Sequence, residues 1–125
     1  MTWLAVAVGG ALGSMARHFV NLEIAHRYER SVPYATATVN VAGSLVIGVL
    51  AGLVATERLA IHTHMRTFLF VGILGGFTTF SSFMLDTFTL GHGGDHLSAA
   101  MNVVGQNALG LALVWVGYYA AIALR

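Results

Sequence analysis

The chain of 125 residues contains no cysteine and no lysine, a single proline, and few charged residues of any kind. Charged residues make up 9% of it, whereas a globular protein carries roughly 25%. So little charge cannot cover a water-facing surface, and it excludes a nucleic-acid-binding protein with a basic stripe. The absence of cysteine excludes disulfides, thiolate metal sites and thiol catalysis.

The chain is instead rich in apolar sequence, with 57% hydrophobic residues and a mean hydropathy of +0.77. The longest stretches without any charged residue are 1–16, 31–56, 67–85 and 96–124. A helix needs about 20 largely apolar residues to cross a bilayer. The sequence therefore predicts an all-α membrane protein with four transmembrane helices in one domain, 1–125. These spans are expected near 2–22, 33–56, 67–91 and 97–124.

The middle of the third expected span is unusually polar. Residues 75–83, GGFTTFSSF, hold two glycines and four hydroxyl side chains. Non-helical backbone at membrane depth is tolerated only where it is buried in protein or lines a cavity. We therefore expect the third helix to be broken near the midplane, with unwound carbonyls able to coordinate a small cation. The alternative is helix packing, because Gly72 and Gly76 form a GxxxG pair.

Polar residues also recur along the second and fourth expected spans. Thr36, Asn40 and Ser44 are four residues apart and lie on one helical stripe. The fourth span repeats this arrangement with Ser98, Asn102 and Gln106. A buried amide is costly in hydrocarbon unless it is paired, so Asn40 faces other protein or a pore. The stripes are typical either of interhelical hydrogen bonds or of a shared polar pathway.

Within the first span, Arg17 lies about five residues from the expected helix end, roughly 7 Å at the helical rise. An arginine there either reaches the membrane interface or attracts anions. The sequence contains no GxSxG, P-loop or HExxH motif and no nucleophile–base pair within a span. We therefore expect no enzymatic activity.

Three motifs in order resemble those of the Fluc/CrcB family of fluoride channels. Residues 9–18, GGALGSMARH, resemble its first-helix motif GGxxGAxxRY, and residues 39–43, VNVAG, match its VNxxG. Residues 75–83 are similar to its central GGxTTFSTF. The chain departs from the family pattern at Ser14, His18, Ser82, Met84 and Asp86. The resemblance extends along the whole chain.

The resemblance implies a fluoride-selective channel that exports fluoride passively across the cell inner (plasma) membrane and lowers cytoplasmic fluoride. Its partners would be fluoride, the lipid bilayer and a second copy of the chain, in an antiparallel dual-topology dimer with two narrow pathways. The residues implied to line each pathway are Asn40, Thr79, Phe80, Ser81, Ser82, Phe83 and Gln106. A structural sodium ion is the implied cofactor, bound by the backbone carbonyls of Gly75 and Thr78.

The loop charges predict dual topology without reference to the family. The side that holds both termini carries Arg58, Arg66 and Arg125. The opposite side carries Arg27, Arg30 and, if it reaches that interface, Arg17. An arginine excess marks the cytoplasmic side of a membrane protein. The difference here is at most one residue, so we expect the chain to insert in both orientations.

Two other classes of membrane protein compete with a channel. A proton-coupled exporter of the small multidrug-resistance type also has four short helices, but it requires a carboxylate near the middle of the first helix, where this chain has Arg17. A non-transporting membrane scaffold requires no polar residues at depth, which the block at 75–83 contradicts. The sequence therefore favours the channel.

Overall fold

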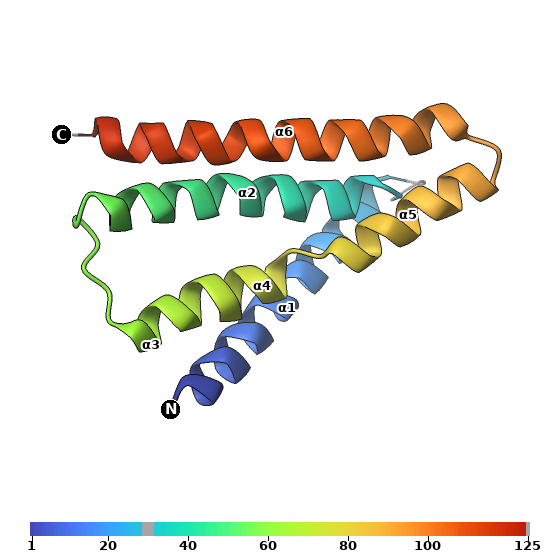
Figure 1. Cartoon of the computed structure of the whole chain (residues 1–125). Helices are drawn as coiled ribbons and strands as arrows, with labels where there is room; N and C mark the ends of the chain where they lie inside the picture. The colour runs from blue at the N-terminus through green and yellow to red at the C-terminus, as the bar shows by residue number, and fades with distance from the viewer. Residues whose placement is uncertain (29–31, 125) are drawn as a thin grey trace.

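The computed structural model describes residues 1–28 and 32–124, which form helices and no strand (Figure 1). Three long helices are continuous: α1 (Thr2–Arg27), α2 (Tyr34–Ala55) and α6 (His96–Ala123). The remaining segment consists of α3 (Thr63–Arg66), the π-helix η1 (Thr67–Leu74), α4 (Gly75–Phe77) and α5 (Phe80–His92). The predicted all-α class is confirmed for this part of the chain. Arg30 and Arg125, which entered the charge comparison, lie outside the described residues.

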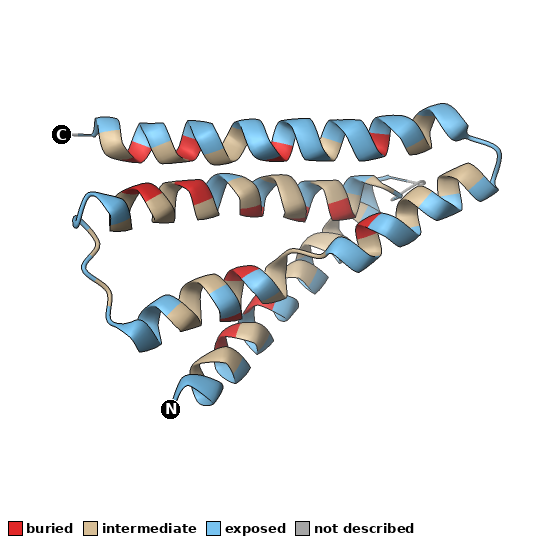
Figure 2. Ribbon diagram, viewed as in Figure 1, coloured by how far each residue is buried: buried red, intermediate tan, exposed pale blue. Residues whose placement is uncertain are grey.

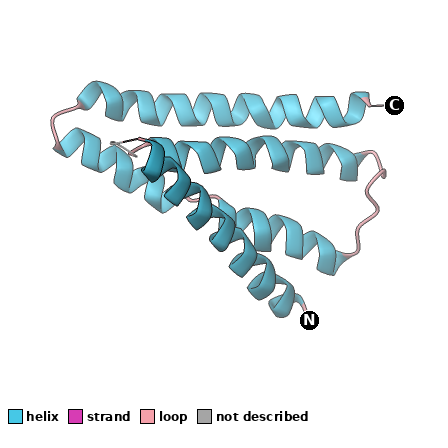
Figure 3. Cartoon of the chain, turned by 180° about the vertical axis from the view of Figure 1, so that it is seen from behind, coloured by secondary structure: helices cyan, strands magenta, loops and turns pink. Residues whose placement is uncertain are grey.

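The helices form two packed pairs. Helices α2 and α6 run side by side in the same direction, whereas α1 crosses the third segment obliquely, behind it in Figure 1 and in front of it in Figure 3. The N-terminus and the end of α6 lie at the same end of the molecule (Figure 1). This is the arrangement that an even number of membrane crossings requires.

The crossing of α1 over the third segment depends on glycines in both partners. A Cβ atom at Gly9 would lie 2.6 Å from the carbonyl oxygen of Phe68 and 2.9 Å from Cα of Gly72. A Cβ atom at Gly76 would lie 2.6 Å from the carbonyl oxygen of Gly10. The GxxxG pair therefore serves helix packing, because only glycine lets the two backbones approach this closely.

The packing of α2 against α6 also depends on glycines. A Cβ atom at Gly52 would lie 2.6 Å from the carbonyl oxygen of Tyr118, and one at Gly117 would lie 2.5 Å from that of Leu45. The two helices thus touch backbone to backbone near their C-terminal ends. The rigid pair positions the polar stripes of both helices against the third segment.

The third segment is interrupted at two threonines. Thr78, with φ −87° and ψ 163°, and Thr79, with φ −155° and ψ 122°, are extended between α4 and α5. Gly75 is helical, with φ −63° and ψ −35°, and α4 continues through Gly76 to Phe77, so the break lies after the glycine pair. Extended backbone suits a β-branched residue, and threonine needs no glycine-like freedom there.

Within the described residues, three helical stretches are long and apolar enough to cross a membrane: Tyr34–Ala55, Thr63–His92 and His96–Ala123. Helix α1 is long enough but more polar, because it carries Arg17 and Glu23 among other polar residues. Exposed residues cover the outward faces of the helices (Figure 2). Many of these are large and apolar, which is the surface expected of a protein surrounded by lipid or by another copy of itself.

Candidate functional site

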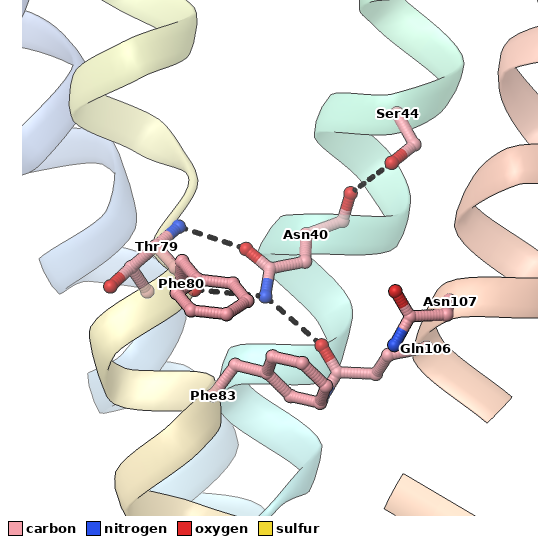
Figure 4. A pocket seen from close by; sticks show the side chains of 7 residues that line it. All are labelled: Asn40, Ser44, Thr79, Phe80, Phe83, Gln106 and Asn107. Atoms are coloured by element: carbon pink, nitrogen blue, oxygen red, sulfur yellow. Dashed lines mark hydrogen bonds between the residues drawn. The ribbon is translucent and has the colours of Figure 1, made fainter. Parts of the chain in front are cut away.

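A cavity of about 220 Å³ lies where the break in the third segment faces α2 and α6 (Figure 4). Its lining consists of Asn40, Ser44, Thr79, Phe80, Phe83, Gln106 and Asn107. None of these lining residues carries a charge. Three segments of the chain that are far apart in sequence therefore converge on one polar but neutral site.

Asn40 binds the break directly. The backbone N–H of Thr79 donates to Asn40 Oδ1 at 2.9 Å, and Asn40 Nδ2 donates to the carbonyl oxygen of Thr79 at 3.1 Å. An extended residue within a helix loses its helical hydrogen-bond partners, and unpaired backbone groups are costly in hydrocarbon. The single amide side chain of α2 replaces both partners, so it stabilises the break that forms the cavity.

A chain of hydrogen bonds continues from Asn40 across to α6 and back to α5. Asn40 Nδ2 also donates to Gln106 Oε1 at 3.0 Å, and Gln106 Nε2 donates to Asn102 Oδ1 at 2.7 Å. Asn102 Nδ2 then donates to Thr87 Oγ1 at 2.9 Å, whose hydroxyl donates to the carbonyl oxygen of Phe83 at 2.8 Å. Asn102 is only 6% exposed. The amide side chains of the α2 and α6 stripes are thus satisfied by one another and by α5.

The two phenylalanines of α5 form one wall of the cavity. Their ring centroids are 5.9 Å apart with an interplanar angle of 65°, an edge-to-face arrangement. Phe83 is 5% exposed, whereas Phe80 is 73% exposed. The positive edge of a phenyl ring can contact an anion, and Phe83 lies beside Gln106 in Figure 4.

The hydroxyl groups after the break cluster on Thr79. Its Oγ1 caps α5 by accepting the backbone N–H of Ser82 at 3.2 Å, and it lies 3.1 Å from Ser82 Oγ and 3.4 Å from Ser81 Oγ. Neither serine is part of the cavity lining. The structure therefore places Ser81 and Ser82 next to the site, connected to it through Thr79.

The carbonyls predicted to bind sodium, those of Gly75 and Thr78, lie on the α1 side of the break. The N–H of Thr79, which would pair with the Gly75 oxygen in a continuous α-helix, donates to Asn40 instead. Arg17 Nη1 donates to the carbonyl oxygen of Thr78 at 3.2 Å. Arg17 therefore points into the protein at the break, and the interpretation that it reaches the interface is wrong.

These carbonyl oxygens are chemically suitable ligands for a hard cation, since such ions bind oxygen ligands. Gly75 supplies a carbonyl without its α-helical partner, and the Thr78 carbonyl has a second lone pair beside the one that Arg17 occupies. One copy of the chain offers only these two ligands. The guanidinium of Arg17 at the same carbonyl also opposes the binding of a cation, so the fit depends on further oxygens from a second copy.

Several residues of the site had not been identified as lining or supporting it. Asn107 lines the cavity, and Ser44, noted only as part of a stripe, lines it as well. Thr87 ends the hydrogen-bond chain. The sequence could have indicated Thr87, because it lies four residues after Phe83 and so on the same helical face. Thr36 is buried at 8% exposure but does not line the cavity.

The chain is similar to known proteins along almost its whole length. The family described as "CrcB-like protein, Camphor Resistance (CrcB)" matches residues 4–118. A protein named fluoride-specific ion channel FluC from Paramagnetospirillum magneticum is 46% identical over 122 residues, covering 97% of this chain and 95% of that protein. FluC proteins from Opitutus terrae and Rhodospirillum rubrum are 46% and 44% identical, covering 98% and 100% of this chain and 94% and 98% of their own lengths. The resemblance inferred from the three motifs is confirmed: the chain belongs to the CrcB-like family, together with these FluC proteins.

Proposed function

We propose that this protein is a fluoride-selective ion channel that lets fluoride leave the cell passively and so lowers cytoplasmic fluoride. The observation that carries the proposal is the neutral, hydrogen-bonding cavity at the break of the third segment, in a chain that belongs with the FluC proteins. The proposed activity is transport alone, with no enzymatic step.

The chemistry of the lining supports fluoride as the ion. Fluoride is small and strongly hydrated, so a pore must replace its water with hydrogen-bond donors. Asn40, Thr79 and Gln106 carry N–H and O–H groups that an anion can recruit as donors in place of their present partners, and the ring edges of Phe80 and Phe83 supply weakly positive surface. Because the lining has no fixed charge, an ion is bound weakly enough to leave again, as conduction requires. Ser81 and Ser82 extend this hydroxyl track beyond the cavity.

We propose a single transmembrane domain over 1–125 that crosses the cell inner (plasma) membrane four times, with α1 as the first span and the break near the midplane. The position of the break supports this placement. Thr78 and Thr79 lie about midway along the stretch Thr63–His92, so a membrane centred on that stretch would be centred on the break.

We further propose an antiparallel homodimer with two pathways. The termini lie at one end of the molecule, and the loop arginines are nearly balanced between the two ends, so both orientations are accessible. A two-fold axis in the membrane plane would bring the two breaks together. The carbonyls of Gly75 and Thr78 from both copies would then supply four oxygens to one sodium ion, whose role would be to join the copies.

Flux from proteoliposomes tests the function. Vesicles loaded with potassium fluoride and containing the purified protein should release fluoride when valinomycin allows potassium to leave. Vesicles loaded with potassium chloride should release little chloride under the same conditions. Equal release of both anions, or release that requires a proton gradient, would contradict a fluoride-selective channel.

A further inference from the structure

The hydrogen-bond chain through the three amides has a single direction, which Thr87 fixes at one end and the Thr79 backbone, through Asn40, fixes at the other. The Thr87 hydroxyl donates its proton to the carbonyl oxygen of Phe83, so Thr87 Oγ1 can only accept from Asn102. Asn102 must therefore direct Nδ2 toward Thr87 and Oδ1 toward Gln106. Gln106 in turn directs Nε2 toward Asn102 and Oε1 toward Asn40.

This direction leaves Asn40 without a free donor. One hydrogen of its Nδ2 is donated to the carbonyl oxygen of Thr79, and the other is donated to Gln106 Oε1. An amide nitrogen carries only two hydrogens. When an anion enters the cavity, both N–H groups of Asn40 are therefore already hydrogen-bonded, and the one beside the cavity donates to the side-chain carbonyl of Gln106 (Figure 4).

Gln106 also separates two cavities. It lines the cavity at the break, and it lines a second cavity of about 380 Å³ between α2 and α6, together with Tyr34, Ala37, Ser98 and Asn102. The second cavity begins at the N-terminal ends of α2 and α6, where Tyr34 and Ser98 are located. The side chain of Gln106 thus lies between the cavity at the helix break and the one at the N-terminal ends of α2 and α6.

We propose that the Gln106 side-chain amide is the movable partition of the fluoride pathway and that Asn102 and Thr87 are the positioning residues that set its resting orientation; this inference rests on the proposed function. Fluoride takes the place of Gln106 Oε1 as the acceptor of Asn40 Nδ2–H. The Gln106 amide turns, so that Nε2–H faces the ion and also donates to it. No covalent bond forms or breaks, and no proton is transferred.

The turned state cannot persist once the ion has left. Turning places Gln106 Oε1 against Asn102 Oδ1, two acceptors without a proton between them. Asn102 can relieve this contact by turning as well only if Thr87 gives up its hydrogen bond to the carbonyl oxygen of Phe83. The resting orientation therefore returns by itself, and the partition closes behind each ion.

The same device discriminates between anions. A hydrogen bond to an ionised acceptor is roughly twice as strong as one to a neutral acceptor, and among halides fluoride accepts hydrogen bonds most strongly. Fluoride can therefore displace the amide carbonyl of Gln106 from Asn40. Chloride is a weaker acceptor and a larger ion, so it does not compensate for the lost amide bond.

Thr87→Val removes the group that fixes the orientation of Asn102 while keeping the shape of the side chain. In this variant Asn102 can turn and donate to Gln106 Oε1, so the turned state of Gln106 around fluoride is no longer opposed by two facing acceptors. The half-saturating fluoride concentration should fall about tenfold, the equivalent of one hydrogen bond. Chloride flux relative to fluoride flux should rise. Thr87→Ser retains the hydroxyl and should behave as the unaltered protein.

Thr89→Val is the matched control. Thr89 lies on the same helix, and its hydroxyl donates to the carbonyl of the residue four positions earlier, as that of Thr87 does. Its side chain receives no bond from another helix among the described residues. Flux in Thr89→Val should keep the half-saturating concentration of the unaltered protein. Equal changes in both valine variants would mean that loss of a hydroxyl from α5 is sufficient, and would overturn the positioning role of Thr87.

Gln106 is the sole glutamine of the chain, so labelling with ¹⁵N-glutamine reports on its side-chain amide alone. In protein reconstituted in nanodiscs, sodium fluoride should shift the two Nε2–H resonances and sodium chloride should not. In Thr87→Val a lower fluoride concentration should be enough to shift them. If the unaltered protein conducts fluoride while these resonances stay unchanged at conducting concentrations, the partition is overturned and the channel function stands. If it does not conduct fluoride, the proposed function itself fails.

Discussion

Asn40 pairs with both backbone polar groups of Thr79, accepting from its N–H at 2.9 Å and donating to its carbonyl at 3.1 Å. The Asn40 side chain thereby pairs with one extended residue of the third segment as the backbone of a neighbouring β-strand would. This pairing explains how a helix can open inside the protein without leaving backbone groups unpaired. It also fixes the distance between the break and α2, and so the width of the cavity.

Asn40→Asp should lower fluoride flux at least tenfold and destabilise the fold by about 1–3 kcal/mol. The aspartate can still accept from the N–H of Thr79, but it loses both donors, and its oxygen then faces the carbonyls of Thr79 and Gln106. Asn107→Asp is the matched control, because Asn107 lines the same cavity while its amide donates only to Val103 on its own helix. Proteoliposome flux and thermal unfolding in detergent measure both effects. Equal loss of flux in the two variants would mean that the added negative charge alone causes the effect.

Phe80→Ile and Phe83→Ile should both reduce fluoride flux severely, because isoleucine keeps bulk but lacks a polarised ring edge. They should differ in stability. Phe83 is buried, so its replacement should cost about 1–1.5 kcal/mol, whereas Phe80 is mostly exposed and its replacement should change the free energy of unfolding little. Phe88→Ile serves as control, since Phe88 is an exposed residue of α5 outside the cavity lining. Undiminished flux in both cavity variants would show that the rings do not line the pathway.

Gly9→Ala should destabilise the protein by about 1–3 kcal/mol, because the new methyl group overlaps the carbonyl of Phe68 and Cα of Gly72. The adjacent Gly10→Ala should be neutral or stabilising, since no atom lies within 4 Å of its Cβ position and alanine favours a helix. Thermal unfolding of the two variants in detergent tests the crossing of α1 over the third segment. Destabilisation by Gly10→Ala alone would contradict this packing and would place a second copy against that face of α1.

Sodium should raise the unfolding temperature of the protein relative to potassium at equal ionic strength, because an ion that binds only the folded state stabilises it. Arg17→Gln should enlarge this sodium-specific increment, since it removes the positive charge that shares the Thr78 carbonyl. Thr78→Ser should leave the increment unchanged, because the proposed ligand is a backbone oxygen. An identical unfolding temperature in both salts for all three proteins would argue against a sodium site at the break.

A cysteine appended after Arg125 should be partly labelled by a membrane-impermeant reagent in intact cells, because the chain has no other cysteine and is expected to insert both ways. Complete labelling or complete protection would mean a single topology and would remove the antiparallel dimer. Two lysines added to the 57–66 loop should shift the labelled fraction and reduce flux. Co-expression with a variant biased the other way should restore flux.

The sequence by itself determined the class of the protein and the chemical groups available to it. Long charge-free runs must lie in a bilayer because no other environment accommodates them, and this is a local property that can be read along the chain. The motifs at 9–18, 39–43 and 75–83 also sufficed to indicate the family. Of the predicted pathway residues, the cavity brings together Asn40, Thr79, Phe80, Phe83 and Gln106.

The tertiary structure alone decided which groups bind one another. The break lies at Thr78 and Thr79, beyond the helical glycine pair, because Asn40 of α2 supplies the lost backbone partners there. Arg17 points toward that break because a free carbonyl is within its reach. The direction of the amide chain depends on Thr87, which belongs to a different helix from any of the three amides. Such choices depend on which helix faces lie together, and side-chain spacing along one helix does not contain that information.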